Sequence, residues 1–157
     1  MKVAKEENEG HEQSRKRSYG GNGMKSEISI LIVDDESTMR NLLEKILARE
    51  GYQMHSVCDG QVALEYLENH KVDIVISDMK MPKMDGFELL KNIKQHHPGV
   101  GVIIMTAYGD TYTVKDALLL GADEYVTKPF KSYEISLVVE RAYWRILSSC
   151  NQMTTEL

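Results

Sequence analysis

Five polar residues follow or end short apolar runs of the chain, at the points where buried strands would end. Asp34 and Asp35 follow ISILIV, Asp78 follows VDIVIS, Thr106 ends VGVIIMT and Lys128 follows DEYVT. Taken singly, each has an ordinary explanation, because aspartates often cap helices or sit in turns and a polar residue often ends a strand in solvent. Taken together, carboxylates, a hydroxyl and an ammonium at four strand ends predict one chemical site.

Three carboxylates in one site repel one another, since a like-charge pair at 4 Å costs about 4 kcal/mol at an effective dielectric near 20. A hard divalent cation offsets this repulsion, and Mg²⁺ is usually held by one or two carboxylates together with phosphate oxygens. The pattern therefore suits phosphoryl chemistry. Asp78 is the candidate nucleophile, which would form an aspartyl phosphate. Thr106 would hydrogen-bond one phosphoryl oxygen, and Lys128 would neutralise another.

The elements that must position these residues alternate between short apolar runs and amphipathic stretches. Strands are expected at residues 28–33, 52–57, 72–77, 100–106 and 123–127. Helices are expected at residues 36–50, 60–70, 85–95, 110–120 and 132–149. Gly51 should end the first helix, and Asp85-Gly86 should form the turn and cap of the third.

Apolar residues recur in the helices at spacings of three and four, which predicts one stripe per helix facing the core. In the helix at residues 36–50, the inward-facing residues are Met39, Leu42, Leu43, Ile46 and Leu47. In the helix at residues 60–70 they are Val62, Ala63, Tyr66 and Leu67, and in the helix at residues 85–95 they are Phe87, Leu90 and Ile93. The stripe of the last helix is Ile135, Val138, Val139, Ala142 and Ile146.

This alternation of strands and helices predicts an α/β fold. The first, third and fourth strands are apolar on both faces, as a parallel sheet covered by helices requires. The crossovers are expected to be right-handed, and a flavodoxin-like (βα)5 three-layer sandwich, with a five-stranded parallel sheet of order 2-1-3-4-5, is one of the two common solutions and the one we expect. In that order the first and third strands are neighbours, and ligands bind at the switch between them. Asp34, Asp35 and Asp78 would then converge on one crevice.

The 157 residues suffice for one domain, and 42% of them are hydrophobic. Residues 1–26 are polar and lack an apolar period, which predicts a disordered leader; its cluster Arg15-Lys16-Arg17 is a solvated tail or a docking arm. The domain is expected at residues 27–148, followed by a flexible tail at residues 149–157. The chain is then a stand-alone module or a fragment cut before an effector domain.

Composition also narrows the location and the partners. The apolar runs are shorter than the roughly 18 residues of a membrane span, and no signal peptide is visible. Cys58 and Cys150 lack metal-ligand spacing and fit idle thiols in the cytoplasm. A net charge of −5 argues against direct contact with nucleic acid, which needs a basic face.

The pieces ILIVDDE, SDMKMPKMDG, MTAYG and GADEYVTKPF resemble the receiver domain of bacterial two-component response regulators, from about residue 28 to residue 148. TAYG and KPF look most like receivers of the nitrogen-regulatory subfamily. The resemblance implies that Asp78 takes phosphate from a phosphohistidine of a sensor histidine kinase. Asp34 and Asp35 would hold Mg²⁺ together with Asp78 and the backbone carbonyl of Lys80, and Lys128 would contact the phosphoryl group.

The resemblance also implies a switch. Thr106 would turn toward the phosphoryl group, Tyr125 would rotate into the vacated space, and the face built from the fourth helix, the fifth strand and the fifth helix would change. Pro129 would follow a cis peptide bond. Lys80 and Tyr108 occupy positions that tune dephosphorylation, so the lifetime of the phosphorylated form stays open.

Tyr133, Leu137 and Trp144 lie off the apolar stripe of the last helix, as half-buried edge residues or as an exposed patch for a homodimer or an effector. A receiver that catalyses only its own phosphorylation and dephosphorylation is the predicted function. Two alternatives stay open. A Mg²⁺-dependent phosphohydrolase would want a second aspartate two residues after the nucleophile, where this chain has Lys80. A degenerate receiver would take no phosphate.

Overall fold

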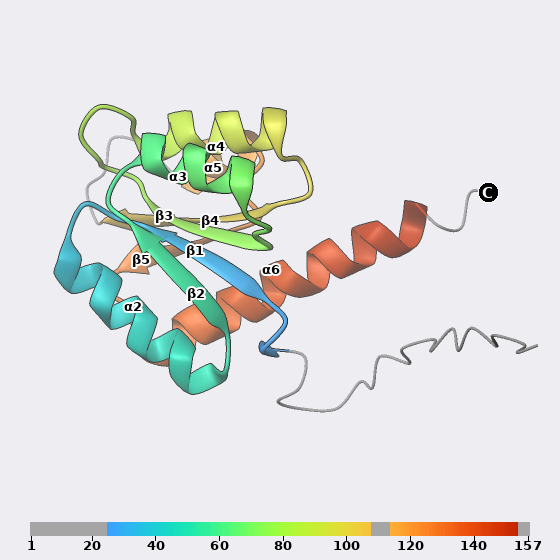
Figure 1. The fold of residues 1–157 in the computed structure, drawn as a ribbon, viewed down its shortest axis with the longest axis horizontal. Coiled ribbons are helices and arrows are strands. Elements are labelled where there is room, and N and C mark those ends of the chain that lie inside the picture. Colours follow the sequence, from blue (N-terminus) through green and yellow to red (C-terminus); the bar gives the residue numbers. More distant parts are fainter. Residues whose placement is uncertain (1–24, 108–113, 154–157) are drawn as a thin grey trace, which may run out of the picture.

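The computed structural model of the chain describes residues 25–107 and 114–153. Five parallel strands form one sheet in the order β2-β1-β3-β4-β5, and a helix follows each strand (Figure 1). The strands are β1 (Ser29–Val33), β2 (Gln53–Val57), β3 (Ile74–Asp78), β4 (Gly101–Ala107) and β5 (Glu124–Lys128). The helices are α2 (Ser37–Glu50), α3 (Gly60–Asn69), α4 (Gly86–His96), α5 (Val114–Leu119) and α6 (Ser132–Met153). The predicted flavodoxin-like α/β fold is confirmed.

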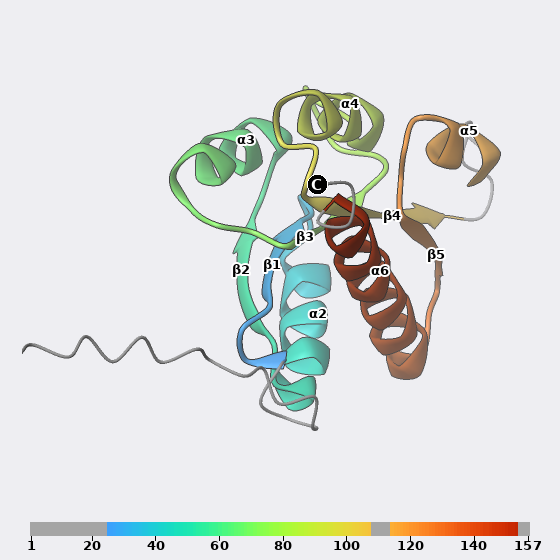
Figure 2. The same ribbon diagram turned by 90° about the vertical axis from the view of Figure 1, so that its right-hand side faces the viewer.

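The helices cover both faces of the sheet. α3, α4 and α5 lie on one face, and α2 and α6 lie on the other (Figures 1 and 2). The last turns of α6 project beyond the edge of the sheet (Figure 1). Among the described helices, none is both long enough and apolar enough to cross a membrane.

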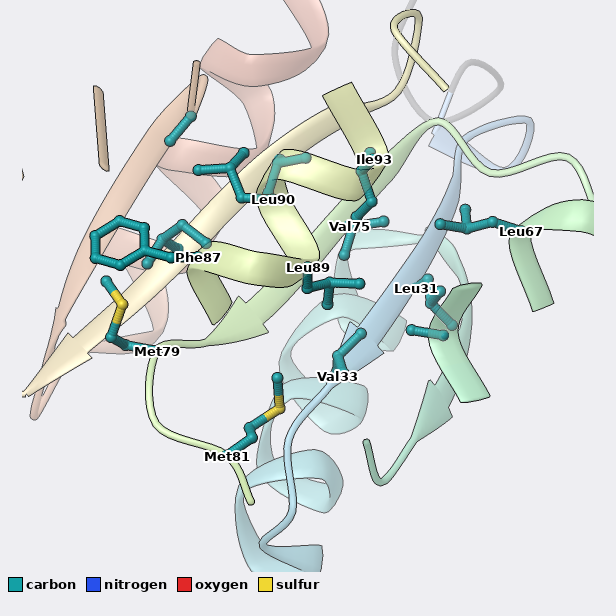
Figure 3. Close-up of a cluster of buried hydrophobic side chains, with 14 of the residues drawn as sticks. Leu31, Val33, Leu67, Val75, Met79, Met81, Phe87, Leu89, Leu90 and Ile93 are labelled. Carbon is teal, nitrogen blue, oxygen red and sulfur yellow. The ribbon is translucent and has the colours of Figure 1, made fainter. Parts of the chain in front are cut away.

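Two clusters of buried side chains form the core, because alternate residues of each strand face opposite helix layers. Leu31 of β1 packs with α3 and α4, whereas Ile30 packs with α2 and α6. Figure 3 shows the first cluster, which also contains Met79 and Met81 of the loop after β3. Full burial of one such side chain contributes about 1.5–3 kcal/mol. The two clusters therefore hold the strands, and the loop after β3, in fixed positions.

Three residues depart from the predicted stripes. Leu42 of α2 and Val62 of α3 were expected to face the core, but they are 44% and 39% exposed, because each helix contacts the sheet over a narrower arc than its apolar stripe. Conversely, Leu89 of α4 is fully buried although it was not predicted to be. α4 lies between α3 and α5, so a wider arc of this helix is covered (Figure 2).

Helix and strand ends agree with the sequence where a residue enforces them. Gly51 ends α2 with φ at 90° and donates its N–H to the Ala48 carbonyl at 3.1 Å, as predicted. α6 instead continues to Met153, past its predicted end at residue 149, because no glycine or proline follows to stop it. β3 and β5 each extend one residue further than expected and include Asp78 and Lys128.

Parts of the predicted organisation lie outside the described residues: most of the leader (1–24), the start of the fourth predicted helix (110–113), the end of the tail (154–157) and Tyr108. Lys25 is described, and its ammonium lies 2.8 Å from the Glu50 carboxylate at the end of α2. This residue was assigned to the leader because apolar periodicity cannot reveal an ion pair.

Gly86 joins the start of α4 to the end of β3. Its N–H donates to the Met79 carbonyl at 2.8 Å. A Cβ at this position would lie 2.4 Å from the Asp78 carbonyl oxygen and 2.9 Å from the Met79 Cα, and both are main-chain atoms that no side-chain rotation can move away. Asp85 caps α4 as predicted, accepting from the Glu88 N–H at 2.9 Å, but the close approach at Gly86 was not predicted.

We expect Gly86→Ala to lower the free energy of unfolding by about 1–3 kcal/mol, the usual cost of an overpacked site. The matched control is Gly99→Ala, because a Cβ on Gly99 would have no atom within 4 Å. Urea denaturation of both variants checks this, and equal stability of the two would contradict the close contact.

Candidate functional site

The sheet order brings the three aspartates together. β1 and β3 are hydrogen-bonded neighbours with Val33 opposite Ser77. Asp34 and Asp78, the next residues, therefore lie side by side at the carboxyl ends of the two strands. One carboxylate oxygen each from Asp34, Asp35 and Asp78 lies within 4.8 Å of the others. Asp34 is completely buried, Asp78 is half-buried and Asp35 is exposed. The site therefore has one side closed by the fold and one side open to solvent.

Lys128 reaches this cluster from β5, at the far edge of the sheet. Its ammonium lies 3.1 Å from Asp78 Oδ1 and 3.4 Å from Asp34 Oδ2. The peptide bond that follows, Lys128–Pro129, is cis, as the resemblance implied. Of the five residues predicted at strand ends, four are thus in one group. Within this group of four described residues, three carboxylates face one ammonium, so the group keeps an excess of negative charge.

Burial and charge act in opposite directions on these groups. Burial raises the pKa of Asp78, and the hydrogen bond and charge of Lys128 only partly counter it. Burial also disfavours the charged form of Lys128, but its hydrogen bonds to Asp78 and Asp34 and their charges outweigh this, and its pKa is raised. Lys128 therefore stays protonated at neutral pH, as a donor to Asp78.

Asp34 is held by its own backbone as well as by Lys128. Its N–H donates to the Val57 carbonyl at 3.3 Å, and its Oδ1 accepts from the Glu36 N–H at 2.9 Å. Neither Asp34 nor Asp35 caps α2, since the N-cap residue is Glu36. Arg40 of α2 donates to the Asp34 carbonyl at 2.7 Å. Sequence reasoning missed Arg40, because a single basic residue on the polar side of a helix carries no recognisable signal.

Thr106 and Tyr125 occupy the neighbouring strands. Thr106 is buried at the carboxyl end of β4, and within the described residues its hydroxyl is paired with that of Thr127 on β5, 3.4 Å away. Tyr125 of β5 is 37% exposed. The side chain of Lys80 is exposed. The structure therefore brings together Asp34, Asp35, Asp78 and Lys128, while the hydroxyl of Thr106 pairs with β5.

The donor set fits a hard divalent cation. All three side chains in the cluster offer oxygen, and no sulfur or imidazole ligand accompanies them among the described residues. Met79 and Met105 lie nearby in the sequence but are buried in the two core clusters. The excess negative charge and the open side at Asp35 suit a cation that keeps some of its water.

The raised pKa of Asp78 leads to a stability prediction. The folded state binds the proton of this carboxyl more tightly than the unfolded state does, so ionised Asp78 lowers stability at pH 7, and the penalty disappears as the pH falls through the folded-state pKa. Without divalent metal, Asp78→Asn should raise the Tm at pH 7 by a few degrees, on the order of 1 kcal/mol. The difference from wild type should shrink toward about pH 4.

Thermal denaturation in EDTA at several pH values measures this difference. Asp59→Asn is the control, because Asp59 caps α3 by accepting from the Val62 N–H and asparagine caps equally well. A lower Tm for Asp78→Asn at pH 7 would show that the ion pair with Lys128 outweighs burial.

Comparison with known proteins agrees with this geometry. The family model described as the response regulator receiver domain matches residues 30–140. The regulatory protein AtoC of Escherichia coli (strain K12) is 42% identical over 113 residues, which are 72% of this chain and 24% of AtoC. Sporulation initiation phosphotransferase F of Bacillus subtilis (strain 168) is 41% identical over 112 residues, which are 71% of this chain and 90% of that protein.

Solved structures show the same likeness. NtrX from Brucella abortus superimposes with a TM-score of 0.78 at 31% identity, over 82% of this chain and 30% of NtrX. A receiver domain protein from Clostridium thermocellum gives a TM-score of 0.71 at 35% identity, over 75% of this chain and 95% of the other. The chain spans about a quarter of the length of AtoC and of the transcriptional regulator NtrC of E. coli, to which it is 43% identical. The chain belongs to the receiver domains of two-component response regulators, with relatives in the nitrogen-regulatory subfamily.

Proposed function

We propose that this receiver accepts a phosphoryl group on Asp78 from the phosphohistidine of a sensor histidine kinase, in a Mg²⁺-dependent reaction. The observation that carries the proposal is the position of the Asp78 carboxylate, 3.1 Å from the Lys128 ammonium and within 4.8 Å of the oxygens of Asp34 and Asp35. A lone carboxylate is a poor nucleophile toward a phosphoryl group in water, so a fixed arrangement of charges around it is the feature that the reaction needs.

The hydrogen bonds of Asp78 support different proposed tasks for its two oxygens. Oδ1 accepts from the Met79 N–H at 3.0 Å and from Lys128 at 3.1 Å. Oδ2 is then the oxygen that attacks phosphorus, forming the O–P bond as the N–P bond to the imidazole breaks. The bonding pair stays on the imidazole nitrogen. Lys128, already beside Asp78, shares the negative charge of the phosphoryl oxygens in the transition state.

Asp34, Asp35 and Asp78 would hold Mg²⁺, with the backbone carbonyl of Lys80 as a further ligand. The bound ion would neutralise the carboxylates and the incoming phosphoryl oxygens, which otherwise repel each other. Asp34 is buried and fixed, so it supplies a rigid ligand, whereas exposed Asp35 leaves room for water. Lys80 is exposed and stands where a phosphohydrolase of this kind would have its second aspartate, so the proposed activity is self-phosphorylation and self-dephosphorylation rather than substrate turnover.

Replacing Asp78 with asparagine should abolish labelling by a small phosphodonor such as acetyl phosphate. Wild-type protein with Mg²⁺ should gain the mass of one phosphoryl group, and EDTA should prevent the gain. Asp85→Asn is the matched control, because it changes the other carboxylate of the same loop and keeps the cap of α4. Intact-mass spectrometry gives the readout. Labelling of Asp78→Asn, or many turnovers of the donor, would contradict the proposal.

Phosphorylation would be read out through β4 and β5. Thr106 would leave Thr127 and donate to the phosphoryl group, and Tyr125 would move into the space next to it. The face formed by α5, β5 and α6 would change with Tyr125. Coupling of about 1–3 kcal/mol between site and face is ordinary for such switches. The proposed partners at this face are a second copy of the chain or an effector, and the proposed setting is the cytoplasm.

The elements of this face carry large exposed apolar side chains, and Tyr125 of β5 and Leu137 of α6 line one shallow hollow. The exposed side chains are Leu118, Leu119, Tyr125, Tyr133, Leu137 and Trp144, with exposed fractions from 37% to 74%. Beside them, the buried Glu124 carboxylate of β5 lies 3.1 Å from Arg141 and 3.2 Å from Arg145 of α6. An exposed apolar patch next to paired charges is typical of a surface that contacts another protein.

We expect the phosphate mimic beryllofluoride with Mg²⁺ to raise the affinity of this face for its partner by about 5- to 150-fold, the factor that 1–3 kcal/mol corresponds to. If the partner is a second copy, the protein should form dimers at a lower concentration with the mimic than without it. Light scattering at a series of protein concentrations measures the molar mass in both cases. Leu137→Ser should weaken the effect. Leu42→Ser, an equally exposed leucine on α2, is the control, and equal effects of the two would exclude the face.

A further inference from the structure

Arg40 contacts the peptide group that joins two of the proposed metal ligands. Its Nη1 donates to the main-chain carbonyl oxygen of Asp34 at 2.7 Å. This carbonyl belongs to the peptide between Asp34 and Asp35. Arg40 lies in the first turns of α2 and is itself half-buried. A 2.7 Å bond from a charged donor is short and strong, so it fixes the plane of that peptide.

Asp34 does not depend on Arg40 for its position. Its N–H is bonded to Val57, its Oδ1 to the Glu36 N–H and its Oδ2 to Lys128, and its side chain is fully buried. Four separate contacts, counting Arg40, therefore hold this one residue. The loss of one of them would leave the Asp34 carboxylate in place.

Asp35 is different. It is exposed, and within the part of the chain that the structure describes no hydrogen bond is found to its carboxylate. The N-cap residue that follows, Glu36, makes no side-chain capping bond. The Asp35 carboxylate nevertheless lies within 4.8 Å of those of Asp34 and Asp78. The main chain holds it from both sides: the peptide after Asp35 through the Glu36 N–H, which donates to Asp34 Oδ1 at 2.9 Å, and the peptide before it through Arg40.

We propose that Arg40 is a positioning residue for the metal site, which aims the Asp35 carboxylate at Asp34 and Asp78 by fixing the peptide between Asp34 and Asp35. The inference rests on the proposed function, since it assigns Arg40 a task in that same site. Residues that orient metal ligands without touching the metal typically account for 10- to 100-fold in metal affinity.

The charge of Arg40 makes the test decisive. By charge alone, removing a cation beside the site would tighten the binding of Mg²⁺, because like charges repel. Loss of the positioning contact would weaken it. The two effects have opposite signs, so the direction of the change separates a positioning role from a purely electrostatic one.

The experiment is an equilibrium titration of the full chain with MgCl₂, followed by calorimetry. We expect Arg40→Ala to raise the Mg²⁺ dissociation constant about 10-fold. Arg40→Lys should lie between Arg40→Ala and wild type, because lysine keeps the charge and can donate hydrogen bonds but lacks the planar fork of the guanidinium. Arg49→Ala, which removes the same side chain from the exposed last turn of α2, is the control and should bind as wild type does.

Phosphorylation by acetyl phosphate gives a second readout. Since Arg40 acts only through Asp35, the labelling rate of Arg40→Ala should approach that of wild type at saturating Mg²⁺ and fall only at low Mg²⁺. The Tm in EDTA should differ from that of wild type by no more than a few degrees. If Arg40→Ala does not fold, the Mg²⁺ affinity of Arg40→Lys is compared with that of wild type instead.

An Arg40→Ala protein that binds Mg²⁺ as tightly as wild type, or more tightly, overturns the inference and leaves the proposed function intact. A wild-type protein that binds no Mg²⁺ and takes no phosphoryl group overturns both. Equally weak binding by Arg49→Ala would show a general disturbance of α2 rather than loss of the contact with the Asp34 carbonyl, and would also overturn the inference.

Discussion

Repulsion among three carboxylates at one edge of the sheet is the constraint on which the rest of this structure depends. Asp34 is completely buried and Asp78 is half-buried, and among residues 25–107 and 114–153 only Lys128 supplies a positive charge in contact with both. The raised pKa of Asp78 shows that this one ammonium does not fully offset burial. The arrangement persists because the two apolar clusters and the strand ladder fix the backbone around it.

The same rigidity determines how the site can communicate. β4 and β5 are paired with Thr106 opposite Thr127 and Ala107 opposite Lys128, so the ammonium of the site and the buried hydroxyl lie on one ladder. Tyr125 lies two residues from Thr127 on the same strand and reaches the surface beside α6. Asp78 on β3 is therefore two strands away from the exposed apolar face at β5, and packed residues of β4 lie between them. Packed interiors of this kind shift between discrete arrangements rather than deforming gradually.

Much of the fold could be predicted because its signals are local. Apolar runs, helical stripes and Gly51 specified five strands, five helices and one helix end. The predicted burial of single helix residues was wrong where it depended on how the helix packs against its neighbours. Leu42 and Val62 belong to their apolar stripes but lie at the borders of the helix contacts, and Leu89 is buried because α4 has helices on both sides. The end of α6 was placed too early because the sequence there contains no residue that enforces a stop.

By itself, the sequence determined the residue types of the site, their places at strand ends and the strand order that would bring them together. The tertiary structure decided the rest. It made Lys128 a partner of both Asp34 and Asp78, paired Thr106 with Thr127, left Gly86 no room for a Cβ and placed Arg40 on the Asp34 carbonyl. These are distances between atoms far apart in the chain. Strand periodicity specifies which face a residue occupies, but only packing specifies which atom it meets.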